Sequence, residues 1–208
     1  MISNIKRFVG LLLLLLFNIQ LSNGQSKVIW EIGKADNKSD EMALAPAGFA
    51  KFLDHDFGWE DRYFLVGYSK AATDFAYVLP GPNDAWGGTG PTSGLRTHSA
   101  NILFGLKSKP AKGEYKLIID LVGFQSVTPP LFKVSINGKS FVKQLPKHKK
   151  DDAVNDNLKD VQEFIWEISL SADQLRKGGN EVSLTTLDGS WMVFDQVKLS
   201  GPQDVQLT

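Results

Sequence analysis

The chain of 208 residues carries 23 Lys and Arg side chains against 23 Asp and Glu, so its formal net charge is zero at pH 7 with neutral histidines. A surface that binds nucleic acid needs clustered positive charge, so this balance leads us to expect no nucleic-acid partner. The chain contains no cysteine, which excludes a disulfide framework and a thiol-linked lipid anchor.

The N-terminal residues have the three-part pattern of a secretory signal peptide. Lys6 and Arg7 precede an apolar run over residues 8–21, and small residues follow before Gln25. The run is shorter than the ~20 residues that a bilayer-spanning helix needs, so we expect no membrane anchor. We therefore predict a signal peptide over residues 1–24, a single domain over residues 25–208, and a secreted or periplasmic product.

The first half of the mature chain has three predicted strands joined by long, turn-rich segments. The strands begin at Val28 (VIWEIG), Asp61 (DRYFLVGY) and Ser99 (SANILFGL). Between the first two strands, residues 47–53 favour one or two helical turns, with Pro46 at the first helical position.

The second half is more regular. A strand is predicted over residues 114–124, and a hairpin over 131–145 turns at Asn137-Gly138, a dipeptide that supplies the positive φ angles of a type I′ turn. The segment 161–170 alternates, so we expect a strand with one face formed by Phe164, Trp166 and Ile168 and the other by Ile165, Glu167 and Ser169.

One short helix and two strands close the chain. Residues 171–179 predict the helix, with Ser171 as its cap and Gly178 or Gly179 at its end. The final strands flank Asp188-Gly189, a second tight-turn signal. About eight strands with one minor helix predict an all-β, antiparallel β-sandwich of the jelly-roll type.

The loop PGPNDAWGGTGPTSGLRTH, residues 80–98, is the best candidate for a binding site. Sugars present apolar C–H faces flanked by hydroxyls, so they are commonly recognised by an aromatic surface with a few fixed polar groups. Trp86 offers the surface, and the polar contacts would come from Asn83, Asp84, Arg96 and His98. In the alternative interpretation Trp86 folds back over the sandwich end and Arg96 pairs with an acid.

The acidic and aromatic segment 54–64 is a weaker candidate. Trp59 either lines the same end as Trp86 or packs in the core. Metal-binding spacing is missing from the segment, and no catalytic motif appears elsewhere, so we assign neither catalytic residues nor metal ligands.

We expect no cofactor, and the alternative is one structural calcium ion. Many β-sandwich domains that bind sugars hold such an ion between the first and last strands, where Glu31 and Asp195 lie. Two carboxylates fall short of the 6 to 8 oxygens that calcium takes, and the alternative is a buried, hydrogen-bonded Asp195.

Six segments stand out in chain order: WEIGKADNKSDEMA, HDFGWEDRYFLVGYS, GEYKLIIDL, INGKSF, LRKGGNEVSL and SWMVFDQVKL. Together they resemble the C-terminal carbohydrate-binding-like domain of rhamnogalacturonan lyases, the polysaccharide lyase family 4 type, over residues 30–199. The resemblance implies a jelly roll of the galactose-binding type. In the family, catalysis belongs to a separate domain, and we expect no room for that domain in this chain. The resemblance also implies a pectin-type ligand, whose carboxylates Arg96 would bind through two parallel hydrogen bonds.

The sequence therefore predicts a secreted, non-catalytic carbohydrate-binding-like module for pectin-type or related acidic polysaccharide. Two alternatives stay open: a small polysaccharide lyase or glycoside hydrolase that uses the same cleft, and a structural or interaction domain of a polysaccharide-utilisation system.

Overall fold

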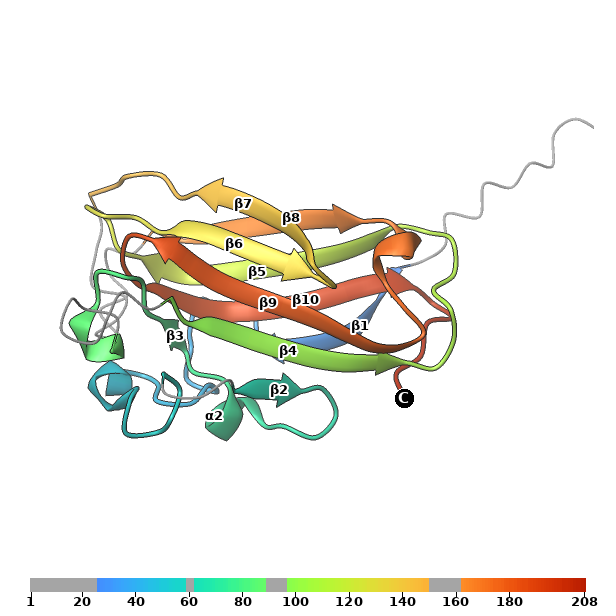
Figure 1. Cartoon of the computed structure of the whole chain (residues 1–208), viewed down its shortest axis with the longest axis horizontal. Helices are drawn as coiled ribbons and strands as arrows, with labels where there is room; N and C mark the ends of the chain where they lie inside the picture. The colour runs from blue at the N-terminus through green and yellow to red at the C-terminus, as the bar shows by residue number, and fades with distance from the viewer. Residues whose placement is uncertain (1–25, 59–61, 89–96, 150–161) are drawn as a thin grey trace, which may run out of the picture.

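The computed structural model describes residues 26–58, 62–88, 97–149 and 162–208, and it shows two facing five-stranded sheets (Figure 1). The expected all-β sandwich of the jelly-roll type is confirmed. The predicted signal peptide over residues 1–24 lies outside the described residues. Within the described ranges, no helix has both the length and the apolar character that a membrane crossing requires.

The first sheet is antiparallel throughout. Its order is β1-β10-β5-β8, and the two-residue β3 also pairs with β10. The first and last strands of the sandwich are therefore direct neighbours. The strands of this sheet are β1 (Ser26–Gly33), β3 (Val78–Leu79), β5 (Tyr115–Phe124), β8 (Phe164–Leu170) and β10 (Met192–Pro202).

The second sheet has the order β2-β4-β9-β6-β7, and one of its pairs corrects the antiparallel expectation. Strands β2 and β4 run parallel, because the chain between them passes through α2 (Ala71–Asp74), β3 and η2 (Ala85–Gly87) before it returns in the same direction. The strands of this sheet are β2 (Tyr63–Leu65), β4 (Ser99–Leu106), β6 (Leu131–Ile136), β7 (Lys139–Gln144) and β9 (Gly178–Asp188).

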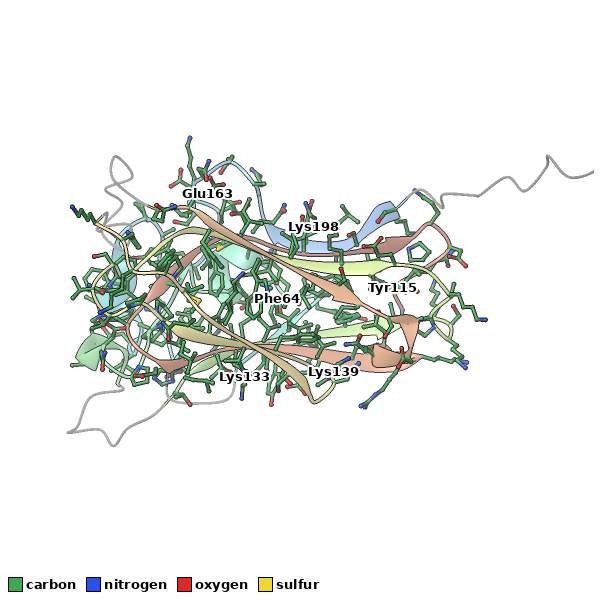
Figure 2. All side chains as sticks on the ribbon, turned by 90° about the horizontal axis from the view of Figure 1, so that it is seen from above. Phe64, Tyr115, Lys133, Lys139, Glu163 and Lys198 are labelled. Carbon is green, nitrogen blue, oxygen red and sulfur yellow. The ribbon has the colours of Figure 1, made fainter. Side chains whose placement is uncertain are left out.

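Alternating side chains explain how the two sheets pack. In β8, Ile168 is buried and Phe164 and Trp166 are half-buried, whereas Ile165 and Glu167 on the other face are exposed, as predicted. Each large apolar side chain that is fully buried contributes about 1.5–3 kcal/mol. Figure 2 looks along the layers, with Phe64 and Tyr115 in the space between them.

The predicted hairpin turn at Asn137-Gly138 is confirmed, whereas the turn at Asp188-Gly189 closes no hairpin, because it leads from β9 in one sheet to β10 in the other. Asn137 and Gly138, between β6 and β7, have φ angles of 50° and 91°, the left-handed values that a type I′ turn requires. Gly189, between β9 and β10, has φ of 84°, and a Cβ there would meet the Pro129 carbonyl oxygen at 2.5 Å. Glycine is therefore required at this turn for both conformation and space.

One of the two predicted helices is shorter than expected. Residues 171–179 form only η6 (Ala172–Gln174), because the chain is already extended at Leu175 and Gly178 opens β9 instead of ending a helix. Within 47–53 the expected helical turn is present as η1 (Gly48–Lys51), but Pro46 lies before the N-cap position and outside the helix. Both segments lie across the sandwich ends, where tertiary contacts override local propensity.

Candidate functional site

Four of the predicted sugar-binding residues lie at one end of the sandwich, which we call the Trp86 end: residues 80–88, His98 and η1 (Figure 1). Trp86 lies in η2 and is half-buried. Its ring meets those of Phe49 and Phe52 edge-on, with centroids 5.1 and 5.9 Å apart. Edge-on pairs of this kind stabilise an aromatic in place, so part of the indole surface serves packing.

Asp84 is buried and joins the loop to the β9–β10 turn. Its carboxylate accepts a hydrogen bond from the Gly81 backbone N–H at 2.8 Å and another from the Ser190 hydroxyl. Burial raises the pKa of Asp84, and these two hydrogen bonds oppose the rise. Gly81 is needed here, because a Cβ would lie 2.4 Å from the Gly189 carbonyl oxygen. Asp84 therefore holds the loop together from inside.

His98 is also an internal residue. It is 7% exposed, one ring nitrogen contacts the Gly87 carbonyl oxygen, and its ring lies 5.7 Å from that of Phe52. Asn83 is exposed, and its backbone N–H donates to the Gly189 carbonyl at 3.1 Å. The structure thus brings Asn83, Asp84, Trp86 and His98 together at the Trp86 end. The predicted Trp59 and Arg96 lie outside the described residues.

The carboxylates of the proposed calcium site have other partners in this structure. Asp195 is 1% exposed and accepts backbone N–H groups of Asp36, Asn37 and Lys38 at 3.0–3.4 Å. Glu31 is exposed and accepts from the Gln196 amide at 3.3 Å. Across the described ranges, no three acidic or histidine side chains gather in a way that would hold a metal ion. The loop after β1 therefore supplies the hydrogen bonds that the buried Asp195 accepts.

A second buried carboxyl lies near Asp195 on the neighbouring strand. Asp120 of β5 is 5% exposed, and among the described residues its Oδ1 atom has no hydrogen-bond partner. Burial, followed by repulsion from Asp195 and Glu163, raises the pKa of Asp120 to about 6, and Lys198 opposes the rise. The raised pKa means that folding favours the protonated form of this carboxyl.

An open groove of about 650 Å³ lies on the second sheet, beside β2, β4 and β9. We call it the Tyr68 groove. It combines two aromatic side chains, aliphatic side chains, glycines and a polar rim, and its lining residues are Leu65, Val66, Tyr68, Leu103, Phe104, Gly105, Asn137, Arg176, Gly178, Gly179, Asn180, Glu181 and Thr208. Trp86 does not line this groove.

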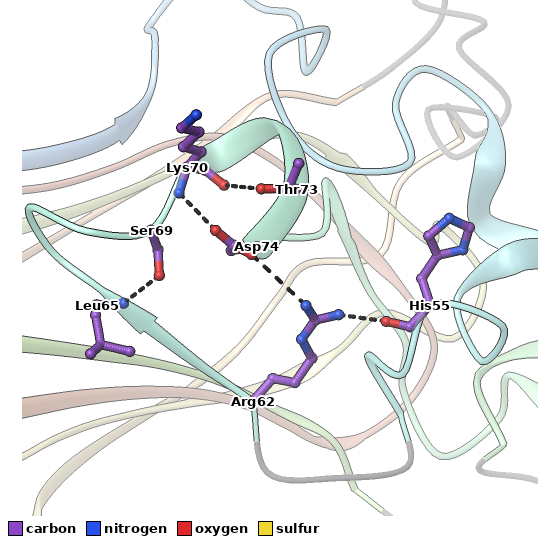
Figure 3. A network of polar contacts seen from close by, with 7 residues as sticks. All are labelled: His55, Arg62, Leu65, Ser69, Lys70, Thr73 and Asp74. Atoms are coloured by element: carbon purple, nitrogen blue, oxygen red, sulfur yellow. Dashed lines mark hydrogen bonds and ion pairs between the residues drawn. The ribbon is translucent and has the colours of Figure 1, made fainter.

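The turn after β2 builds one wall of the Tyr68 groove. The Leu65 carbonyl accepts N–H groups of Tyr68 and Ser69 at 3.0 and 2.8 Å, and the Ser69 hydroxyl accepts the Leu65 N–H at 3.0 Å. Figure 3 shows how this turn continues into α2, where Asp74 accepts the Lys70 N–H at 2.8 Å. The wall is therefore a hydrogen-bonded turn and not a loose loop.

A buried asparagine builds the opposite wall. Asn180 is 3% exposed, and its side chain makes four hydrogen bonds of 2.8–2.9 Å: to both backbone groups of Arg176, to the Gly178 carbonyl and to the Asn137 amide. The exposed Arg176 guanidinium donates to the Asn137 carbonyl at 3.2 Å. The type I′ turn and the start of β9 are thereby fixed to each other.

Sequence reasoning missed this groove because Tyr68 was assigned to a strand. The structure ends β2 at Leu65, three residues before Tyr68. The available signal was Gly67 between Val66 and Tyr68, since a glycine at the end of a strand pattern often marks a turn. The GGN segment at 178–180 was assigned to a helix end, although it forms the start of a strand that lines the groove.

A second open groove, of about 890 Å³, lies on the outer face of the first sheet, and we call it the lysine groove. Lys116 forms an ion pair with Glu167 at 3.0 Å, and this contact raises the pKa of Lys116. Four lysines face two glutamates here, so the groove has a net positive character. Its lining residues are Ser26, Lys27, Val28, Lys112, Gly113, Glu114, Lys116, Ile118, Glu167, Lys198, Ser200 and Pro202.

A comparison with protein families finds a match over nearly the whole sandwich. The family model described as CBM-like, polysaccharide lyase family 4, domain III, matches residues 28–199. The chain belongs to this CBM-like family. The resemblance expected from the sequence is thereby confirmed.

Solved structures similar to the CBM-like domain are distant. A family 35 carbohydrate-binding module from an environmental isolate is similar over 73% of this chain and 87% of its own, with 12% identity and a TM-score of 0.38. A ruminal GH26 endo-β-1,4-mannanase covers 83% of this chain, with 16% identity and a TM-score of 0.36. A GH115 4-O-methyl-α-glucuronidase covers 50%, with 18% identity and a TM-score of 0.35.

The domain spans 26% of the mannanase chain and 13% of the glucuronidase chain. A comparison with curated proteins finds no match to this chain.

Proposed function

We propose that this CBM-like domain is a secreted, non-catalytic module that binds pectin-type or related acidic polysaccharide. The observation that carries the proposal is the family match over residues 28–199. Secretion follows from the signal-peptide pattern, with Lys6 and Arg7 ahead of an apolar run. The bound polysaccharide lies across the surface of the sandwich, and the protein holds it without changing it.

The lysine groove supports an acidic ligand. Lys27, Lys112 and Lys198 line it together with the ion-paired Lys116, and only Glu114 and Glu167 oppose them. A chain of galacturonate residues carries one carboxylate for each sugar, so it matches a row of lysines by charge. Each contact is solvent-exposed and weak, so affinity depends on several sugars bound together.

Titration of the protein with galacturonate oligomers at increasing salt tests the proposal. We expect binding in the millimolar range or tighter, with affinity that falls as salt screens the lysines. The double variant Lys27→Met with Lys112→Met should bind about 3- to 10-fold more weakly. A matched pair on the second sheet, Lys133→Met with Lys139→Met, should bind as the unmodified protein does.

Two results would replace this function with one of the alternatives. New unsaturated or reducing ends after incubation with pectic substrates would make the protein a lyase or a hydrolase. Absence of binding to every acidic oligomer at millimolar concentration would remove the polysaccharide ligand and leave an interaction domain.

A further inference from the structure

Tyr68 is the most exposed large apolar or aromatic side chain of the described part of the chain. It is 83% exposed, whereas the other exposed members of this class range from 40% to 67%. The backbone that carries this ring is nevertheless fixed, because the turn is hydrogen-bonded at Leu65 and Ser69. An exposed aromatic ring on an ordered turn can present a face to a ligand.

The floor beside Tyr68 is open and apolar. A Cβ added at Gly178 or Gly179 would meet no atom within 4 Å, so the backbone there is open to close approach. Leu65 is 44% exposed and lines the same groove together with Leu103. Glycine backbone beside an aromatic ring and two aliphatic side chains leaves room for the apolar C–H face of a sugar ring.

The rim of the Tyr68 groove is polar but has little net charge. Arg176 and Glu181 both line it and offset each other, and Asn137 adds a neutral polar group. The lysine groove, by contrast, has four cations against two anions. A ligand carboxylate would be attracted by Arg176 and repelled by Glu181. A pair of neighbouring sugar hydroxyls, in contrast, can accept a hydrogen bond from the Arg176 guanidinium and donate one to the Glu181 carboxylate.

We propose that the Tyr68 groove is a separate binding site for a neutral sugar. One ring face stacks on Tyr68, and neighbouring hydroxyls bind Arg176 and Glu181. This inference deepens the proposed function and rests on it, because both assume that the domain binds polysaccharide. It assigns neutral residues of the polysaccharide to the second sheet and acidic residues to the lysine groove on the first sheet. The two grooves together would hold a chain that contains both kinds of sugar, or two neighbouring chains.

Two probes test the assignment: a neutral β-1,4-linked galacto-oligosaccharide of four sugars, and a galacturonate oligomer of the same length. Affinity for the neutral probe should fall about tenfold in Tyr68→Ala, the loss expected for a central aromatic contact, and by less than about threefold in Tyr68→Phe, which keeps the ring. Arg176→Met should weaken binding of the neutral probe about 3- to 10-fold. Salt should change this affinity little, because the groove has little net charge.

Matched controls separate the site from general surface effects. Tyr63→Ala removes an exposed tyrosine of β2 outside the groove, and Lys177→Met removes the cation next to Arg176 in the chain; both should leave neutral-probe affinity within about twofold. The acidic probe should bind Tyr68→Ala as it binds the unmodified protein.

The possible outcomes are distinct. Equal loss for Tyr63→Ala and Tyr68→Ala would overturn the site, and so would failure of the neutral probe to bind at millimolar concentration while the acidic probe binds. If neither probe binds, the proposed function falls together with this inference. Binding of the acidic probe that depends on Tyr68 and not on the lysines would reverse the assignment of the two grooves.

Discussion

Two aromatic side chains lie on glycine-bearing turns of this molecule, and their surroundings differ. Trp86 lies in the loop that the sequence marked as a sugar platform, yet Phe49 and Phe52 pack against its ring. Tyr68 lies in a turn that the sequence did not mark, and it is 83% exposed. Glycine and proline around an aromatic show that the backbone turns there. Whether the ring faces solvent depends on residues elsewhere in the chain.

The largest difference between the two regions should appear in stability. Phe52 is 2% exposed and packs against Trp86 and His98, so Phe52→Ala should lower the free energy of unfolding by about 3–5 kcal/mol. Tyr68→Ala removes no packing and should change that free energy by no more than about 0.5 kcal/mol. Urea unfolding measures both. A loss above about 2 kcal/mol for Tyr68→Ala would show that the groove is part of the core.

A smaller loss is expected from the polar connection inside the Trp86 end. Asp84→Ala leaves the Gly81 N–H and the Ser190 hydroxyl without their buried acceptor, which should cost about 1–3 kcal/mol in unfolding free energy. Asn83→Ala next to it removes an exposed side chain and serves as the control, with a change within about 0.5 kcal/mol. Equal effects of the two substitutions would contradict the internal role given to Asp84.

The same carboxyl makes the Trp86 end sensitive to pH. The pKa of Asp84 is raised in the folded state, so its contribution to stability is full below the unfolded value of 3.8 and is lost as pH rises through the folded pKa. Asp84→Asn can keep both hydrogen bonds, since the amide oxygen accepts from Gly81 and the amide nitrogen donates to Ser190.

The stability of Asp84→Asn relative to the unmodified protein should therefore rise with pH over this range. Unfolding free energies of both proteins from acid to neutral pH give the comparison. A constant difference at every pH would contradict the raised pKa.

A stability effect smaller than that of Phe52→Ala or Asp84→Ala is expected from filling the Tyr68 groove. A Cβ at Gly179 meets no atom within 4 Å, so Gly179→Leu should change unfolding free energy by no more than about 0.5–1 kcal/mol. The same substitution should weaken binding of the neutral probe about tenfold or more, because the side chain occupies the floor of the groove. Unchanged neutral-probe affinity in the folded variant would show that the sugar lies elsewhere.

Most of the fold could be predicted because it depends on alternation and turn chemistry along the chain. The hairpin at Asn137-Gly138 and the buried face of β8 follow from such local patterns. The parallel pairing of β2 with β4 could not be predicted, because it depends on the path of a connection more than 30 residues long, from Val66 to His98. The short helix at 172–174 was overestimated for a similar reason, since contacts at the sandwich end determine where it stops.

The candidate site was less predictable than the fold. The sequence indicated residue types suited to sugar binding, but it did not indicate that Asp84 would pair with Ser190, 106 positions away. It also gave no sign that Arg176 and Tyr68 would line one groove, because strands β4 and β9 bring them together only in the folded sheet. Sugar binding by Trp86, Asn83, Asp84, His98, Arg96 and Trp59 stays a prediction.

The last residues of the chain determine how the protein can be attached to a surface. After β10, Leu207 bridges to Leu106, and the Thr208 N–H donates to the Gly105 carbonyl at 3.0 Å. Thr208 lies so close that a Cβ at Gly105 would meet its hydroxyl oxygen at 2.0 Å, and it lines the Tyr68 groove. An affinity tag or chip linkage fused after Thr208 would therefore hinder ligand access to that groove. A biosensor that couples the protein through the exposed Lys143 of β7, which lines neither groove, would leave both grooves uncovered.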